Sequence, residues 1–245
     1  MKVLASDFDG TLLFNNEFRE GDLKKIKEFQ KAGNLFGLCS GRPFKGIYEF
    51  CKPYIDFDFY ILCTGALVLN KKREVVYKST ITKHVLKEFF NRYFDDYDIF
   101  IQANLQLYTF LKEDLGSMVR TVITSLDEVE GDIYGLSMNA KTDENARKVC
   151  LDIEKYFPEL TAHQNKEFID ITEKGCSKGT GILKLKELMK IDEIAGIGDS
   201  YNDISMLETV NHSFTFPTSP ESLTSIVDDV VDSVEEALNL LMQES

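Results

Sequence analysis

The sequence predicts an α/β protein in which a parallel-sheet core is interrupted by an inserted α+β cap domain. In the first third of the chain, short apolar segments alternate with helical periodicity, as expected for a sheet that is covered on both faces. Near residue 80 the pattern changes to helices and paired strands, and after about residue 175 the first pattern returns. We therefore expect residues 1–79 and 175–245 to form the core and residues 80–174 to form the cap.

The core elements are predicted from apolar segments, helical periodicity and residues that begin or end helices. The strands expected in the first part cover residues 3–5, 35–39 and 59–63. Between them, apolar residues at helical spacing end at Gly33, and Pro43 suits the first turn of a helix that continues through Phe50. The elements expected after the cap are a helix over 181–189, a strand over 194–197, a helix following Asn202 and an amphipathic helix over 234–241.

The cap elements follow a different order. The expected elements are a helix at 84–94, alternating strands within 99–110, a helix over 143–156 and a strand over 168–171. Four aromatic residues lie on consecutive turns of the first helix, and we expect them to form cap core rather than to contact substrate: Phe89, Phe90, Tyr93 and Phe94. The cap is expected to open and close over the site, with hinges at residues 78–82 and 172–176.

Composition excludes several classes of function. The 245 residues carry a formal net charge of −13, which argues against a surface for nucleic acid or anionic membrane. No apolar segment approaches the roughly 18 residues of a membrane span, and the first residues lack the apolar region of a signal peptide. Five cysteines without a C-x-x-C pair are expected to be reduced thiols. We expect a cytoplasmic protein, with a monomer as the default.

Two carboxylates stand at the end of the first predicted strand. Asp7 and Asp9 are one residue apart, so they leave the strand on the same side, and Gly10 then turns the chain. Carboxylates this close repel each other unless a cation or a shared proton relieves them. An ordinary Asp-Gly turn would explain the pair if it stood alone. Because other strands also end in polar residues, the pair suggests a site for a hard metal ion with a potential oxygen nucleophile.

The other strands end in polar residues that are expected to meet the carboxylate pair. These strand ends carry Ser40-Gly41-Arg42, Thr64-Gly65 and the segment 198–203. Ligands bind outside the carboxyl ends of parallel strands, so all of these residues are expected to converge in one crevice. Ser40 offers a hydroxyl group, and Gly41 lets backbone N–H groups approach an anion near a helix start. Arg42 either reaches the substrate or supports its loop.

The segment 198–203 adds acidic residues, and the chain before it adds a lysine. Asp199 completes a carboxylate-rich site that is suited to Mg²⁺. Asn202 and Asp203 begin the next helix, and we expect one of them to cap it and the other to orient the metal ligands. Lys178 lies at the entry to a helix and is followed by two nearby glycines, which favours a role in binding an anion.

The order of these segments resembles the four motifs of the haloacid dehalogenase superfamily of phosphohydrolases. The motifs stand here as DFDGTL from Asp7, SGR from Ser40, SKG from Ser177 and GDSYNDISML from Gly198. The insertion between the second and third motifs, with Phe168–Ile171 before the third, resembles the class IIB, Cof-type branch. The resemblance implies a Rossmann-like core with an α+β cap. It also implies a Mg²⁺-dependent phosphatase that hydrolyses a small phosphomonoester, such as a sugar phosphate or a similar metabolite.

The resemblance further implies a role for each matching residue. Asp7 would be the nucleophile that forms an aspartyl-phosphate, and Asp9 would be the general acid and base. The ligands of Mg²⁺ would be Asp7, Asp9 through its backbone carbonyl, and Asp199. The residues that bind the phosphoryl oxygens would be Ser40, Gly41 and Lys178. The supporting positions would be those of Arg42, Asn202 and Asp203.

Two segments depart from the Cof-type pattern. Thr64-Gly65-Ala66 stands where the family usually has Asn-Gly-Ala. A hydroxyl group cannot supply the two donors of an amide, so we expect no substrate role for Thr64. Residues 214–220 replace a segment that often contains glycine and asparagine in the family. Neither departure affects the residues to which the chemistry is assigned.

Three other functions compete with the phosphatase. A class IIB phosphomutase would need a basic cluster for a bisphosphate, whereas Lys112, Arg120 and Lys141 are scattered through the cap. A catalytically silent phosphate-binding regulatory protein would be expected to lack Asp7 or Asp9, and both are present. A D-x-D glycosyltransferase would need neither the lysine nor the second Gly-Asp motif. The cap sets the substrate, and these residues do not identify it.

Overall fold

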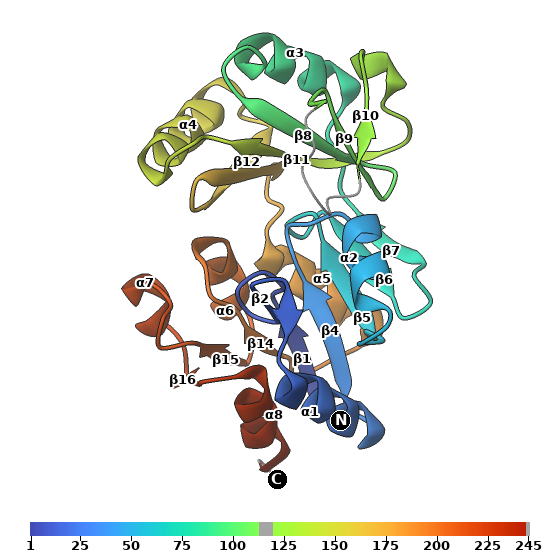
Figure 1. The fold of residues 1–245 in the computed structure, drawn as a ribbon, viewed down its shortest axis with the longest axis vertical. Coiled ribbons are helices and arrows are strands. Elements are labelled where there is room, and N and C mark those ends of the chain that lie inside the picture. The colour runs from blue at the N-terminus through green and yellow to red at the C-terminus, as the bar shows by residue number, and fades with distance from the viewer. Residues whose placement is uncertain (113–119, 244–245) are drawn as a thin grey trace.

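A core and a cap stacked upon it make up the computed structural model, which describes residues 1–112 and 120–243 (Figure 1). The core contains an eight-stranded sheet in the order β16 (Asp229–Val230), β15 (His212–Thr215), β14 (Ala195–Ile197), β1 (Val3–Ser6), β4 (Leu35–Cys39), β5 (Phe59–Leu62), β6 (Leu67–Asn70) and β7 (Val75–Lys78). The strands from β16 to β5 are parallel, whereas β6 and β7 are antiparallel to their neighbours. The predicted fold class is confirmed.

Helices cover both faces of the core sheet, because consecutive residues of its strands point to opposite sides. Leu4 packs in one apolar cluster with α1 (Glu20–Lys31), α2 (Phe44–Cys51) and α8 (Val234–Gln243). Ala5 packs in a second cluster with α5 (Lys178–Met189), α6 (Ile204–Leu207) and α7 (Glu221–Thr224). Burial on both sides explains why β1 is a continuous apolar segment. It also places the strand at the centre of the core, between β14 and β4.

The cap is a sheet covered by helices on the side away from the core (Figure 1). Its strands run in the order β10 (Thr121–Val122), β9 (Gln106–Thr109), β8 (Asp98–Ala103), β11 (Ile133–Asn139), β13 (Phe168–Glu173) and β12 (Leu160–Asn165). The helices are α3 (Lys83–Tyr93), α4 (Asp143–Tyr156) and the 3₁₀ turn η1 (Leu126–Glu128). The side chains of Thr82 and Thr142 cap α3 and α4, as expected for threonine at an N-cap.

The aromatic cluster predicted on the first cap helix is correct for three of its four residues. Phe89, Phe90 and Tyr93 are buried in the apolar cluster of the cap. Phe94 was predicted to join them, but its side chain is 44% exposed. It is the C-cap residue of α3, so it lies beyond the face that packs on the sheet, and it stacks on Phe90 and contacts Phe110 at the rim of the cap.

Several short elements were not predicted. They include the hairpin β2 (Leu13–Phe14) and β3 (Glu17–Phe18), the antiparallel pair β6 and β7, and the last two strands on the other side of the core sheet, β15 and β16. The boundaries predicted after residues 79 and 174 stay predictions, and they fall in the β7–α3 and β13–α5 connections. The five cysteines are free thiols. In the described part of the chain, no helix combines the length and apolarity that crossing a membrane requires.

Candidate active site

Three neighbouring parallel strands deliver the polar residues of the site to one edge of the core sheet. Asp7 directly follows β1, and its backbone N donates to the carbonyl of Ile197 at the end of β14, 2.9 Å away. Asp199 stands two residues after Ile197, and Ser40 directly follows β4 on the other side of β1. Parallel strands end at the same edge, which is why residues nearly two hundred positions apart in the sequence meet here.

A buried lysine lies between two buried carboxylates at the floor of the site. Nζ of Lys178 lies 2.5 Å from Oδ1 of Asp7 and 2.6 Å from Oδ1 of Asp203, and Lys178 is fully buried. Burial alone would lower the pKa of Lys178, but the carboxylates of Asp203 and Asp7 outweigh it and hold that pKa well above its usual value. Lys178 is therefore charged and balances part of the negative charge around Asp7.

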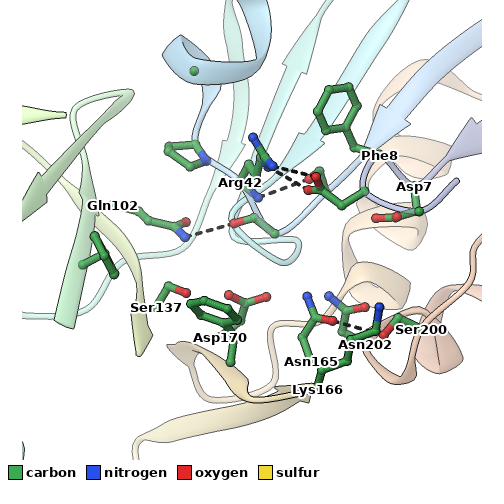
Figure 2. Close-up of a pocket in the computed structure, with 18 of the residues that line it drawn as sticks. Asp7, Phe8, Arg42, Gln102, Ser137, Asn165, Lys166, Asp170, Ser200 and Asn202 are labelled. Carbon is green, nitrogen blue, oxygen red and sulfur yellow. Dashed lines mark hydrogen bonds and ion pairs between the residues drawn. The ribbon is translucent and has the colours of Figure 1, made fainter. Parts of the chain in front are cut away.

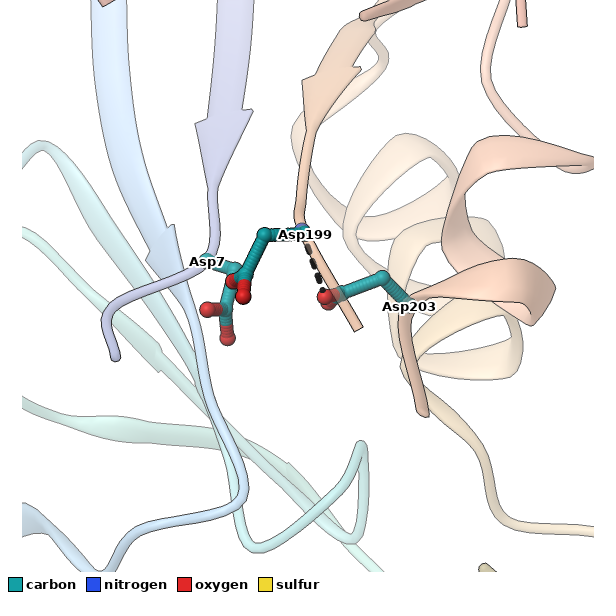
Figure 3. A group of neighbouring side chains, drawn as sticks. All are labelled: Asp7, Asp199 and Asp203. Carbon is teal, nitrogen blue, oxygen red and sulfur yellow. Dashed lines mark hydrogen bonds between the residues drawn. The ribbon is translucent and has the colours of Figure 1, made fainter. Parts of the chain in front are cut away.

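Three carboxylates cluster around this floor (Figure 3). Oxygen atoms of Asp7, Asp199 and Asp203 all lie within 4.8 Å of one another. Burial and repulsion by Asp203 raise the pKa of Asp7 well above its usual range, and the same two causes raise the pKa of Asp199 to about 6. Such carboxylates gain stability from a hard cation, for which carboxylate oxygen is the preferred ligand. The cluster fits Mg²⁺, although the ligand roles remain predictions.

The contacts already made by these carboxylates indicate which oxygens are left for a cation. Asp203 uses Oδ1 for Lys178 and Oδ2 for the backbone N–H groups of Asp199 and Ser200. Asp7 uses Oδ1 for Lys178, and Asp199 uses Oδ1 for the hydroxyl of Thr11, 3.0 Å away. The Oδ2 atoms of Asp7 and Asp199 are therefore the candidate carboxylate ligands. The roles of Asp7 and Asp199 as ligands and of Asp203 as a support stay predictions.

The start of the helix after β14 shows which residue caps it. We expected one of Asn202 and Asp203 to cap this helix and the other to orient the metal ligands; Asp203 takes the capping role, and the metal-orienting role stays a prediction. Ser200 is the N-cap of the 3₁₀ turn η2 (Tyr201–Asp203), and the carboxylate of Asp203 accepts from its backbone N, 3.0 Å away. Asp203 therefore both caps the turn and holds Lys178, whereas Asn202 lines the cavity above it. Asp203 fills both roles because each of its two buried carboxylate oxygens accepts from a different partner.

Asp9 pairs with Arg42. Nε and the terminal Nη2 of Arg42 donate to the two carboxylate oxygens of Asp9 at 2.7 and 2.6 Å. Both side chains are about half exposed at the mouth of the site, at 47% and 48%. The sequence left open whether Arg42 supports its loop or reaches the substrate, and here it contacts Asp9. The carbonyl ligand role predicted for Asp9 stays a prediction.

The loop after β4 brings its backbone close to the cap. Ser40 is buried, and its Oγ accepts from the backbone N of Arg42 at 3.2 Å, which fixes the turn. A side chain at Gly41 would place Cβ only 2.5 Å from Oδ2 of Asp170 on β13 of the cap. Glycine is thus required at residue 41 by the close approach of the cap. The phosphate-binding roles of Ser40 and Gly41 remain predictions.

A cavity of about 720 Å³ lies between the core and the cap, above Asp7. Among the described residues, three hydrogen bonds join the cap to the core around it. The amide of Gln102 donates to the carbonyl of Gly41 at 3.0 Å, and the hydroxyl of Ser200 donates to Asn165 at 3.1 Å. The third joins the hydroxyl of Thr64 to Asp170 at 3.3 Å. Thr64 is not among the residues that line the cavity, and its hydroxyl contacts Asp170 of the cap.

The sequence analysis did not assign Gln102 and Asp170 to the site. Both side chains are buried between the cap and the core, at 3% and 7% exposure. Each is a polar residue between two apolar residues of a strand, so the alternation along β8 and β13 contained the necessary signal. The sequence did not show which face of the cap sheet turns toward the core.

Comparisons with known proteins agree with this geometry. A family profile described as haloacid dehalogenase-like hydrolase matches residues 4–238. An uncharacterised protein of Mycoplasma capricolum subsp. capricolum is 30% identical over 234 residues, which cover 84% of this chain and 87% of that protein. A Haemophilus influenzae protein that is provisionally named a phosphatase is 23% identical over 259 residues, which cover 99% of this chain and 97% of that protein.

Solved structures share the whole fold at low sequence identity. A haloacid dehalogenase-like hydrolase from B. subtilis superposes with a TM-score of 0.87 at 20% identity, with 100% of both chains covered. A sugar phosphatase of subclass IIB superposes with a TM-score of 0.81 at 20% identity, covering 99% of this chain and 98% of that one. At these identities the likeness shows that core and cap are arranged alike.

Proposed function

Since the chain belongs to the haloacid dehalogenase-like hydrolase family and is a phosphoric monoester hydrolase, we propose that it acts through an aspartyl-phosphate on Asp7 and depends on Mg²⁺. The observation that carries the proposal is the 2.5 Å contact between Asp7, which lines the cavity, and the fully buried Lys178. A carboxylate held by a fixed cation is placed for attack on a phosphoryl group above it. Phosphoryl transfer needs mainly such positioning and neutralisation of charge.

In the first half of the reaction, a carboxylate oxygen of Asp7 attacks phosphorus, and the bond from phosphorus to the leaving oxygen breaks. Asp9 donates a proton to that oxygen, so an alcohol leaves rather than an alkoxide. Arg42 holds both oxygens of Asp9 in this structure, so Asp9 has to part from Arg42 to reach the leaving group. Ser40 and Lys178 bind the phosphoryl oxygens.

In the second half, water attacks the phosphorus of the aspartyl-phosphate. Asp9, now ionised, accepts a proton from this water, and the bond between phosphorus and the Asp7 oxygen breaks. Inorganic phosphate leaves, and the carboxylate of Asp7 is restored. The contacts of the cap with the core limit the access of bulk water to the cavity during both halves.

Asp7 and Asp199 would hold Mg²⁺ through the oxygens that Lys178 and Thr11 do not use. The bound ion supplies positive charge that offsets the repulsion between the Asp7 carboxylate and the phosphate dianion. The position of Asp199 depends on the close approach of its carboxylate to Gly10, where a side chain would place Cβ only 2.4 Å from Oδ2. Gly10 thus contributes to the site through its lack of a side chain.

The proposal is tested by hydrolysis of para-nitrophenyl phosphate with purified protein in Mg²⁺ and in EDTA. We expect turnover in Mg²⁺, loss of turnover in EDTA, and a loss of at least about a thousandfold in kcat for Asp7→Asn, because the amide is a poor nucleophile. Asp192→Asn is the matched control. It removes the same charge at an exposed residue of the core outside the cavity and should leave kcat unchanged.

The stereochemical course at phosphorus separates the covalent route from direct hydrolysis, and it is measured with a phosphorothioate monoester made chiral by oxygen isotopes, in water that carries the remaining isotope. Attack by Asp7 followed by attack of water at phosphorus comprises two in-line displacements, so the configuration at phosphorus is retained. Direct attack by water is a single in-line displacement and inverts the configuration. Inversion would refute the covalent intermediate, and activity that survives EDTA would refute the dependence on Mg²⁺.

A further inference from the structure

The face of the cap sheet that covers the cavity carries polar side chains beside the apolar Phe100, Leu107 and Phe168. Alternate residues of β8, β11 and β13 point toward the core, and five of those that line the cavity form what we call the polar roof: Asp98, Gln102, Ser137, Asn139 and Asp170. Strand register places Asn139 beside Asp98 and Ser137 beside Asp170. The residues between them pack in the apolar cluster under α3 and α4. The polar roof is therefore not needed to hold the cap together.

The polar roof mostly presents hydrogen-bond acceptors. Asp98 and Asp170 are carboxyl groups, and Gln102 spends its amide nitrogen on the carbonyl of Gly41, 3.0 Å away (Figure 2). That contact fixes the orientation of the amide, because a carbonyl oxygen can only accept. Gln102 is 3% exposed, and its Oε1 is buried without a partner. A buried acceptor of this kind is costly until a donor reaches it.

The polar roof has fewer hydrogen-bond donors than acceptors. Asn139 accepts through Oδ1 from the backbone N of Lys141 at 2.8 Å, which leaves its NH₂ group as a donor. A hydroxyl group on a bound molecule both donates and accepts, so it can pair with the amide of Asn139 and with the acceptors around it. A carboxylate or phosphate only accepts, and it would face Asp98 and Asp170 across the cavity.

The two cations on the cavity wall do not compensate the acids of the polar roof. Arg42 pairs through both donors with the two oxygens of Asp9. Lys166, on the β12–β13 turn, lies close enough to Asp199 to interact with it electrostatically, so it serves the end of the cavity that would hold the phosphoryl group. Beside it, Glu167 adds another carboxylate to the lining. Among the described residues, the half of the cavity under the polar roof thus has no unpaired cation.

We infer that the cap selects phosphomonoesters whose leaving group is uncharged or cationic and carries hydroxyl or amino donors, and that it rejects leaving groups with a second anionic group. Asp98 and Gln102 are the residues that make this selection. The inference rests on the proposed function, because it takes the phosphoryl group to bind at Asp7. It also argues against a phosphomutase, because a bisphosphate would bring its second phosphate to the polar roof.

The inference is tested by calorimetric binding to the Asp7→Asn protein in Mg²⁺, which does not require turnover. 6-Phosphogluconate differs from glucose 6-phosphate in its carboxylate and its open chain, whereas fructose 1,6-bisphosphate keeps the ring of fructose 6-phosphate and adds only a second phosphate. We expect the anionic member of each pair to bind at least about tenfold more weakly, because its second anionic group is repelled by the carboxylates of the polar roof. Equal affinities within both pairs would overturn the inference.

Two variants, each made in the Asp7→Asn protein, assign the effect to the polar roof. Asp98→Asn should strengthen the binding of 6-phosphogluconate by about fivefold and leave glucose 6-phosphate within about twofold. Gln102→Leu should weaken glucose 6-phosphate by about fivefold but not ethyl phosphate, whose leaving group has no hydroxyl. Glu154→Gln, a charge loss on the exposed side of α4, is the control and should change neither.

The outcomes separate this inference from the proposed function. Hydrolysis of para-nitrophenyl phosphate by the unmodified protein reports on the proposed function, because that leaving group carries neither a second anionic group nor a hydroxyl. The paired affinities report on the polar roof. If Asp98→Asn changed both members of a pair equally, or if Gln102→Leu weakened ethyl phosphate as much as glucose 6-phosphate, these residues would not be the selecting ones.

Discussion

Replacement of Lys178 by methionine tests whether this lysine is the counter-charge of the site. The residue is fully buried, and its Nζ lies 2.5 Å from Asp7 and 2.6 Å from Asp203. Methionine retains most of the length but removes the charge, so two carboxylates remain buried side by side. Breaking a buried ion pair in this way costs about 3–5 kcal/mol.

The structure also supplies an upper bound for this loss. The variant can relieve the repulsion by protonating Asp7, whose pKa is already raised by burial and by Asp203. Protonating a carboxyl group with an ordinary pKa near 4 costs about 4 kcal/mol at pH 7, at 1.36 kcal/mol per pH unit. Because the pKa of Asp7 is higher than that, the cost is smaller. We therefore expect Lys178→Met to lower the free energy of unfolding by about 2–4 kcal/mol.

Urea unfolding at pH 7, followed by circular dichroism in EDTA and in Mg²⁺, measures this loss. Mg²⁺ should restore part of the stability, since it neutralises the same carboxylates. Lys184→Met is the matched control on the same helix. Its side chain is 43% exposed and pairs with Glu187, so its loss should stay below about 1 kcal/mol. Asp203→Asn added to Lys178→Met should recover stability. A loss in EDTA no larger than that of the control would refute the reasoning.

Three further predictions follow from single residues. The pKa of Asp199 is raised to about 6, and the proposed Mg²⁺ would bind its ionised form. The Mg²⁺ affinity measured by calorimetry should therefore fall up to about tenfold per pH unit below 6, and an affinity independent of pH would contradict this. Gly65→Ala should lower the free energy of unfolding in urea by more than about 2 kcal/mol, since φ at Gly65 is +91° and the added Cβ would lie 1.9 Å from the carbonyl oxygen of Ser177. Gly33→Ala is the control: φ is +84° but no atom lies near the added Cβ, so its loss should be about 1 kcal/mol. Burial lowers the pKa of His163 below 6.5, so the unfolded chain takes up the proton first and the free energy of unfolding should fall as the pH drops below 6.5. His163→Gln should flatten this part of the plot of urea midpoint against pH, and an unchanged slope would exclude His163 as the cause.

The sequence predicted the convergence of the site because that convergence follows from one rule. Apolar segments flanked by helices indicated a parallel sheet, and a parallel sheet brings all its carboxyl ends to one edge. Asp7, Ser40 and Asp199 meet as expected, and Lys178 lies beneath them. Helix α4 was predicted with the bounds Asp143–Tyr156 that the structure shows, since its cap and its apolar periodicity agree.

The parts that the sequence did not predict depend on contacts between distant side chains. Nothing in the motif of Asp9 indicates that its carboxylate turns to Arg42, because that choice depends on the rotamers of both residues. The contact of Gln102 with Gly41 likewise depends on how the cap is placed on the core. The hairpin of β6 and β7 was missed because its apolar segments are too short to distinguish a strand from a loop.

The central position of β1 has a consequence for synthesis of the chain on the ribosome. Of its two neighbours, β4 follows within about thirty residues, but β14 is the segment Ala195–Ile197. At roughly 5–20 residues per second, a nascent chain waits about 10–40 seconds between the emergence of β1 and that of its second partner. Throughout this interval one side of an apolar strand has no partner and can pair with another chain. Any product that terminates before Ile197 keeps that open edge permanently, so truncated chains of this protein are candidates for aggregation and for capture by chaperones.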